Sequence, residues 1–268
     1  MPGLRELLDY HYSFFDRSRI SPDPLEFLHR YSDPRDIELT GFLASVFAYG
    51  NVRQIIRTID SLLAYLERSP YSSLGPGGKL RGSSEIKHRF YAPHDTDLLL
   101  KTISFILKEH GSLKELFFRG YRPSDKNLKS AISLFSKDFL SYAMAINRGE
   151  LSPGFRFMLP DPENGSACKR MNLFLRWMVR KDELDFGLWS EIASDKLVIP
   201  VDVHVARICT ELRLTHYTTV SWKMAEEITD NLRAFDPDDP VRYDFAICHI
   251  GMRKLDSLNN YPKLKKKS

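Results

Sequence analysis

Cysteine is scarce in this chain: the 268 residues include three, Cys168, Cys209 and Cys248. They are odd in number, lie far apart and form no C-x-x-C pair, so a disulfide framework is not expected. We therefore expect three reduced thiols and a cytoplasmic protein.

Long apolar runs and a strong charge of either sign are also lacking. No segment is apolar over the length of a spanning helix or a secretory signal, so no membrane contact is expected. The net charge of +4 permits binding to nucleic acid but does not argue for it alone. Four lysines within residues 263–268 predict a basic tail with nonspecific attraction to polyanions.

Strand-type alternation of apolar and polar residues is missing as well, whereas apolar spacing of three and four residues recurs along the chain. The sequence therefore predicts an all-α protein with loops at 69–84 and 147–166. Ser112 predicts a further short helix over 113–118, for which it is the cap. The longer expected helices span residues 2–17, 35–48, 52–67, 96–109, 126–146, 169–180, 203–213, 222–234 and 240–252.

The helix that begins at Lys169 has two contrasting faces. Its apolar face carries Met171, Phe174, Leu175 and Met178, and the opposite stripe carries Lys169, Asn172, Arg176 and Arg180. Periodicity alone favours a solvated basic face for this stripe. The alternative is a surface that faces phosphates.

A second informative position is Asp202, which follows the extended segment 199–201 and precedes an apolar helical pattern. That is the expected place for a helix N-cap, in which the carboxylate accepts a bond from an unpaired backbone N–H. A cap is the more frequent role of such an aspartate, so a catalytic interpretation depends on Lys169.

Three segments in this order resemble helix-hairpin-helix DNA glycosylases of the endonuclease III type. Residues 159–172 are similar to the hairpin and catalytic-lysine segment, residues 201–209 to the aspartate segment, and residues 243–251 to the last shared helix. Residues 41–51 carry a weaker similarity to the helix that ends in a DNA-entering loop. The archaeal 8-oxoguanine glycosylase branch is similar in its long separation between lysine and aspartate.

The resemblance implies an enzyme that flips a damaged, for example oxidised, base out of double-stranded DNA and excises it. Lys169 would attack the sugar as a neutral amine to give a Schiff base, and Asp202 would stabilise the developing positive charge or relay a proton. An ordinary amine is protonated at neutral pH, so we expect burial, Arg170 and Arg176 to lower its pKa.

Further residues are expected to contact the nucleic acid. Asn51 would fill the gap left by the flipped base, although its position favours a loop-capping role. Asn164, Gly165 and Ser166 precede the Lys169 helix, whose N-terminus favours anions. Arg170 and Arg176 are expected to contribute to the same surface.

The chain departs from the family pattern in several places. One glycine stands where the hairpin usually has two, and Asn51 stands where the family has glutamine. An additional helix is expected over 182–196. The iron–sulfur cysteines of endonuclease III are absent, so no cofactor is expected.

The implied fold has two helical domains flanking a cleft. A helical barrel would span residues 41–179 and carry Lys169, and residues 1–40 with 180–262 would form a second domain carrying Asp202. The tail at 263–268 would lie outside both domains.

Two other functions stay open. A metal-dependent hydrolase is one, because Asp202, His204, Asp244 and His249 are possible ligands, although no clustered motif joins them. A noncatalytic DNA- or RNA-binding protein is the other, with Lys169 as a phosphate contact. An assay of DNA strand nicking would distinguish such a noncatalytic binding protein from a glycosylase. From their helical spacing, Trp177, Trp189 and Trp222 are expected to belong to the core and not to a base-stacking surface.

Overall fold

The computed structural model describes residues 2–14 and 16–252, and in this part of the chain the predicted all-α class is confirmed. Two isolated bridges, His88–Tyr91 and Lys181–Phe186, are the β-type pairings formed within the described ranges. The α-helices are α1 (Pro2–Phe14), α2 (Pro34–Phe47), α3 (Val52–Tyr65), α4 (Pro70–Leu74), α5 (Pro93–His110), α6 (Leu113–Phe118), α7 (Lys129–Ile146), α8 (Pro153–Met158), α9 (Lys169–Val179), α10 (Val203–Glu211), α11 (Trp222–Arg233) and α12 (Asp244–Met252). Short 3₁₀ helices are η1 (Arg17–Arg19), η2 (Pro24–Arg30), η3 (Pro162–Asn164), η4 (Ser194–Lys196) and η5 (Pro240–Tyr243).

The helix expected over 182–196 does not form, and that expectation is wrong. The segment folds as a turn and loop with η4 at its end. Asp182 accepts hydrogen bonds from the backbone N–H groups of Leu184 and Asp185, and Gly187 has a φ of +63°. Asp185 is buried against Arg176 and Arg180, and the N–H of Trp189 donates to the carbonyl of Met178, so these contacts with α9 hold the segment as a loop.

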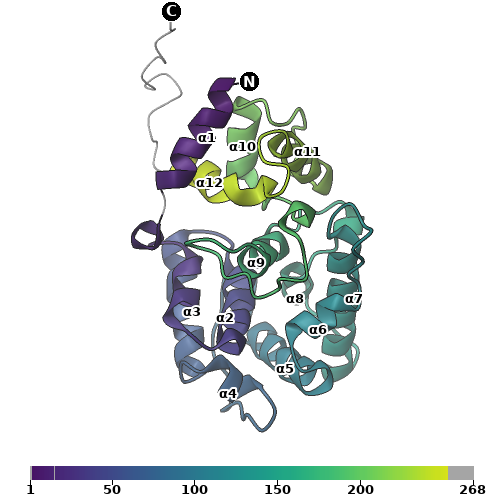
Figure 1. Cartoon of the computed structure of the whole chain (residues 1–268). Helices are drawn as coiled ribbons and strands as arrows, with labels where there is room; N and C mark the ends of the chain where they lie inside the picture. The colour runs from purple at the N-terminus through teal and green to yellow at the C-terminus, as the bar shows by residue number, and fades with distance from the viewer. Residues whose placement is uncertain (1, 15, 253–268) are drawn as a thin grey trace, which may run out of the picture.

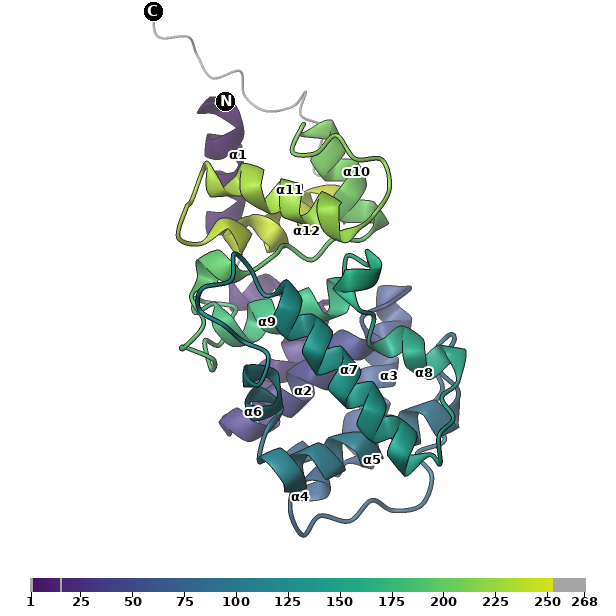
Figure 2. The same ribbon diagram turned by 90° about the vertical axis from the view of Figure 1, so that its right-hand side faces the viewer.

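The helices form two groups, which Figures 1 and 2 show one above the other. The upper group contains α1, α10, α11, η5 and α12, which contact one another. The lower group contains η2 and α2 to α9, with α2 packed against η2, α3, α4 and α9. In both views α9 lies at the boundary, just below α12.

The expected domain limits at 41 and 180 do not match these groups. Residue 41 lies inside α2, whose first turn already packs in the lower group. Beyond 180, the N–H of Trp189 donates to the carbonyl of Met178 and its indole donates to Glu38, so this loop also belongs to the lower group. Residues 253–262 and the tail at 263–268 lie outside the described residues.

The core of the lower group surrounds α2, which is buried from Ile37 to Phe47. Phe42 contacts the rings of Phe135, Phe139 and Phe174 at centroid distances of 5.4–5.9 Å. A side chain at Gly41 would meet Met178 at 3.1 Å, so this glycine lets α2 and α9 approach closely. The consequence for the site is that α9, with Lys169 at its first position, is held firmly by its apolar face.

All three tryptophans, Trp177, Trp189 and Trp222, are fully buried, as expected for core residues. No described helix is both long and apolar enough to cross a lipid bilayer.

Candidate active site

Lys169 and Asp202 lie together, although 33 positions separate them in the sequence. The Lys169 Nζ is 2.8 Å from the Asp202 Oδ2, and each side chain is about one-third exposed, at 32% and 35%. Lys169 opens α9 in the lower group, and Asp202 precedes α10 in the upper group. The pair therefore bridges the two groups at a place that solvent reaches.

Asp202 is also the N-cap that the sequence predicts. Its Oδ1 accepts hydrogen bonds from the N–H groups of His204 at 2.9 Å and Val205 at 3.0 Å. The Oδ2 remains for Lys169, so capping and ion pairing use different oxygens of one carboxylate. The capping bonds hold the Asp202 side chain in one orientation, in which Oδ2 faces Lys169 while Oδ1 caps α10.

The pKa of Lys169 is raised, and the expected lowering is wrong. Burial favours the neutral amine, but the charge of Asp202 and its hydrogen bond outweigh that effect. Burial likewise opposes ionisation of Asp202, yet Lys169 and the two backbone N–H groups lower the pKa of this carboxyl. At neutral pH the resting pair is therefore an ammonium and a carboxylate.

Two further carboxyl groups interact electrostatically with this pair. Asp244 of α12 raises the pKa of Lys169, and the lysine in turn opposes the burial that raises the pKa of Asp23. Burial raises the pKa of the Cys248 thiol to about 12, so the thiol is neutral. Sequence reasoning missed Asp23, because an aspartate before a proline is typical of a helix cap, and it does cap η2.

Arg176 does not belong to a nucleic-acid surface, which corrects the expectation from the sequence. It is buried, with its Nη2 3.1 Å from Asp185 Oδ1 and its Nη1 2.5 Å from Asp244 Oδ2. Arg180, which follows the last residue of α9, is also buried and pairs with Asp185, Asp182 and Asp239. Beyond Lys169, the predicted basic stripe is thus neither solvated nor facing phosphates, because carboxylates of the 180–186 loop and the upper group neutralise Arg176 and Arg180.

Arg170 is likewise withdrawn from the surface. It is buried and donates to the hydroxyl of Tyr91 and to the carbonyl of Phe157, and its guanidinium lies 4.4 Å from the Phe157 ring centroid. Its expected contact with nucleic acid is therefore wrong for this conformation. Asn172, which belongs to the predicted basic stripe, is also buried and donates to the carbonyl of Ala167.

The predicted hairpin residues form a turn ahead of α9. Gly165 has a φ of +82°, and its carbonyl accepts a bond from the N–H of Trp222 at 2.9 Å, which ties the turn to α11. Ser166 Oγ accepts from the N–H of Cys168, so this hydroxyl supports the turn. Asn164 is exposed at the end of η3. Of these three residues, Asn164 has the side chain most accessible to a ligand.

Asn51 is the N-cap of α3, the alternative that the sequence left open. Its side-chain oxygen accepts from the N–H of Arg53 at 3.0 Å, and the residue is exposed. Asn51 belongs to the α2–α3 loop and Lys169 to the first turn of α9, so the two come from separate elements of the lower group.

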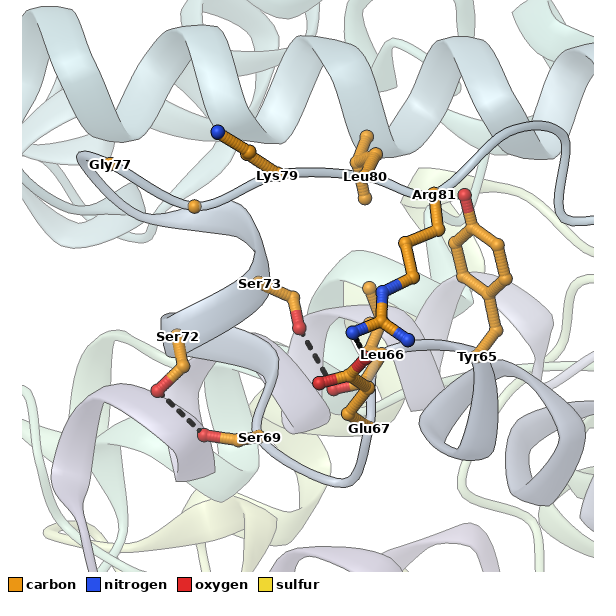
Figure 3. Close-up of a pocket in the computed structure, with 11 residues that line it drawn as sticks. Tyr65, Leu66, Glu67, Ser69, Ser72, Ser73, Gly77, Lys79, Leu80 and Arg81 are labelled. Carbon is orange, nitrogen blue, oxygen red and sulfur yellow. Dashed lines mark hydrogen bonds and ion pairs between the residues drawn. The ribbon is translucent and has the colours of Figure 1, made fainter.

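A separate hollow of about 540 Å³ lies beneath the 75–81 loop, and Figure 3 shows its lining. Its polar groups pair with one another: Ser69 with Ser72 and Arg81 with Glu67. Ser73 donates to the carbonyl of Leu66. These mutual pairs leave no converging set of acid, base and nucleophile in this hollow.

The metal-site alternative finds little support among residues whose side chains the structure describes. Asp244 is engaged by Arg176, and within the described ranges no three His, Cys, Asp or Glu residues converge as metal ligands. His249, the fourth candidate, has a side chain outside that description.

The model of one protein family matches residues 23–253, which is most of the chain. The chain belongs to this family. Its description reads protein of unknown function (DUF2400). Comparison with curated proteins and with solved structures gave no match. The matched range includes both Lys169 and Asp202, so the whole candidate site lies within the family's shared region.

Proposed function

We propose that this DUF2400 protein is a base-excision DNA glycosylase with lyase activity and a helix-hairpin-helix glycosylase-like fold. The observation that carries the proposal is the 2.8 Å contact between Lys169 and Asp202. A partly exposed lysine beside a capped aspartate, at the boundary of two helical groups, suits attack on a sugar carbon. The substrate is double-stranded DNA containing a damaged base, with an oxidised base as the leading class.

The proposed reaction begins when the Lys169 ammonium loses its proton. The amine lone pair then forms a bond to the sugar C1′, and the bond between C1′ and the base breaks with its electron pair leaving on the base. The departing base takes up a proton. The new C1′-bound nitrogen then loses a proton, its lone pair forms the C=N bond of the Schiff base, and the C1′–O4′ bond breaks with its electron pair on O4′, which takes up a proton. Asp202 stabilises the positive charge that develops on the sugar.

The raised pKa of Lys169 sets a condition on this chemistry. A resting ammonium cannot attack, so the proton has to leave after DNA binds. Asp202 is placed to relay it, because its Oδ2 is already within hydrogen-bond distance of the Nζ. Transfer of that proton to the departing base leaves Asp202 as the carboxylate that stabilises the charge on the sugar. The cytoplasmic location expected from the cysteine pattern is part of the same proposal.

A base-release assay on duplexes with single defined lesions tests this function. The wild-type chain should release at least one damaged base, and Lys169→Ala should release it at least about a hundredfold more slowly. Lys114→Ala, which removes a partly exposed lysine on α6 that pairs with Glu191, is the matched control and should release the base at the wild-type rate. Equal rates for Lys169→Ala and the wild type would remove the lysine from the mechanism.

The raised pKa also favours a second candidate, a noncatalytic DNA- or RNA-binding protein. A permanently charged Lys169 would then contact a phosphate and exchange Asp202 for it. Such a protein would bind duplexes with a steep salt dependence and leave every lesion intact.

A further inference from the structure

An exposed aromatic surface lies beside the first turn of α9. Phe90 is 61% exposed and Phe157 is 39% exposed, and with Tyr49 they form three mutual ring contacts at centroid distances of 5.1–6.1 Å. We call these three residues the aromatic platform. Exposed aromatic rings that contact one another are uncommon on a surface without a binding role.

The aromatic platform is assembled from three segments that approach unusually closely. Tyr49 follows α2, Phe90 belongs to the 88–91 turn and Phe157 belongs to α8. A side-chain carbon at Gly154 would lie 2.3 Å from the carbonyl oxygen of Phe90, and one at Gly50 would lie 2.7 Å from the Arg89 side chain. Position 154 therefore requires glycine for this approach, and position 50 requires it because the φ of Gly50 is +110°.

The rings are also held in place from behind. The guanidinium of Arg170 covers Phe157, and the buried His88 has its Nε2 2.9 Å from the carbonyl of Tyr49 and its Nδ1 2.9 Å from Thr58 Oγ1. The Tyr49 loop and the 88–91 turn are thus joined by a buried hydrogen-bonded side chain. A ligand would meet a preformed surface and would not have to order it.

An arginine lies against the exposed side of the aromatic platform. The guanidinium carbon of Arg89 lies 4.8 Å from the Tyr49 ring centroid and 5.5 Å from that of Phe90. Within the described part of the chain, the exposed Arg89 forms no ion pair with a carboxylate. Asp95 lies near Phe90 in the sequence, but it is buried and accepts hydrogen bonds from the N–H of Ala92 and the Oγ of Ser152.

A shallow hollow of about 480 Å³ adjoins the two phenylalanines. Its lining is mainly apolar and includes Phe90, Phe157, Ala92, Pro153 and Gly154. The hollow offers contact to a flat apolar face, while Arg89, which lies over the Phe90 ring, favours negative charge. That combination matches a nucleobase with its flanking phosphate.

We propose that the aromatic platform stacks an unpaired nucleobase of a bound DNA strand while Arg89 contacts the adjacent phosphate. Aromatic faces bind bases with little regard to sequence, and arginine beside them adds phosphate attraction. Arg170 links the aromatic platform to Lys169, its neighbour in the chain. This inference rests on the proposal that the chain binds DNA, and not on the chemistry of Lys169.

The test measures affinity by fluorescence anisotropy for three labelled DNAs of one sequence: a single strand, a duplex with one base opposite an abasic-site analogue, and a fully paired duplex. The double variant Phe90→Ala/Phe157→Ala should bind the first two about tenfold or more weakly than the wild type. Its affinity for the paired duplex should change by less than about twofold, because that DNA offers no free base face.

Two further variants separate stacking from loss of structure. Phe90→Trp keeps an aromatic face and should bind the single strand at least as tightly as the wild type. Tyr10→Ala removes a 57% exposed ring on α1, in the other helical group, and should leave all three affinities unchanged.

A third variant tests the phosphate contact. Arg89→Gln should reduce the salt dependence of single-strand binding by roughly 0.7 in slope, the value for one phosphate.

Wild-type affinity of the double variant for the single strand would overturn the proposal. So would an equal loss for all three DNAs, or failure of the wild type to bind any of them, which would direct attention to a protein partner for the same patch. If the wild type releases no base but shows the expected binding pattern, the glycosylase proposal fails and the aromatic platform stands.

Discussion

At the scale of single residues, one carboxylate sets the properties of the candidate site. Asp202 caps α10 with one oxygen and holds Lys169 with the other, and in doing so it raises the pKa of the lysine. The same contact that brings the pair together therefore keeps Lys169 protonated at rest. In the proposed reaction Asp202 has opposite effects on two steps, because it delays formation of the amine but stabilises the later positive charge.

The variant Asp202→Asn separates these two effects. Removing the charge lowers the pKa of Lys169, so the neutral amine forms at lower pH and adduct formation with a preformed abasic site should shift to lower pH. Base release should fall about a hundredfold or more, because the charge on the sugar loses its partner. The measurements are the pH profile of adduct formation and the rate of base release; a profile shifted to higher pH would contradict the assignment.

Arg176 makes a second prediction at this scale, now about stability. Arg176→Met leaves Asp244 without its guanidinium partner in the interior, and we expect a loss of about 3–5 kcal/mol in the free energy of unfolding. Arg207→Met, which removes an exposed pair with Glu211, should cost less than about 1 kcal/mol. Urea unfolding of both variants checks this contrast, and similar values for the two would show that Arg176 is not held as described.

At the scale of helices and loops, local pattern predicted much of the structure. The nine longer expected helices form with small shifts at their ends, and Ser112 begins α6 as expected. Their apolar residues recur at helical spacing, and their capping residues can be identified from the few residues around each helix end. The short helices α4 and α8 were missed, because five or six residues carry too little periodicity.

Other features depended on contacts between distant segments and could not be predicted from local pattern. The loop that replaces the expected helix over 182–196 is set by burial of Asp185 against Arg176 and Arg180. Those arginines form a regular polar stripe in sequence, and nothing local distinguishes a buried stripe from a solvated one. The Lys169–Asp202 contact was expected from family resemblance and not from spacing.

The cap of α3 gives a prediction for a single element. Asn51→Ala should lower the free energy of unfolding by about 1 kcal/mol, whereas Asn51→Ser should keep most of it, because serine also caps helices. Urea unfolding measures both. An unchanged stability in Asn51→Ala would mean that the exposed amide is free for another role.

The 88–91 turn gives a prediction about pH. Burial is the main cause of the lowered pKa of His88, so the folded chain favours its neutral form and the unfolded chain takes up the proton first. Its contribution to stability is therefore present above a pH of about 6.5, the unperturbed value, and is lost as pH falls below it. His88→Gln should show a smaller decrease in unfolding free energy between pH about 8 and about 5 than the wild type. An identical decrease in both proteins would contradict this role.

At the scale of the whole molecule, charged contacts join the two helical groups. Arg176 with Asp244, Arg180 with Asp239 and Lys169 with Asp202 all cross from the lower group, or its boundary helix, to the upper one. Two of these three contacts involve buried arginines, and breaking a buried pair is costly. The candidate site is thus built into a boundary that the chain holds together strongly.

We therefore expect the two groups to unfold as one unit. Trp222 reports on the upper group, whereas Trp177 and Trp189 report on the lower one. In urea, Trp222→Phe should give a fluorescence transition that coincides with its transition by circular dichroism. Two separated transitions would show that the groups are independent domains.

The central claim is that Lys169 is a nucleophile that forms a Schiff base with DNA, and borohydride trapping tests it most directly. Purified wild type and Lys169→Ala would be mixed with labelled duplexes that contain 8-oxoguanine, an oxidised pyrimidine, uracil or an abasic site. The account predicts a covalent adduct in the wild type that is absent in Lys169→Ala, and the best-trapped lesion would identify the substrate class. No adduct with any duplex, or an adduct that persists without Lys169, would contradict it.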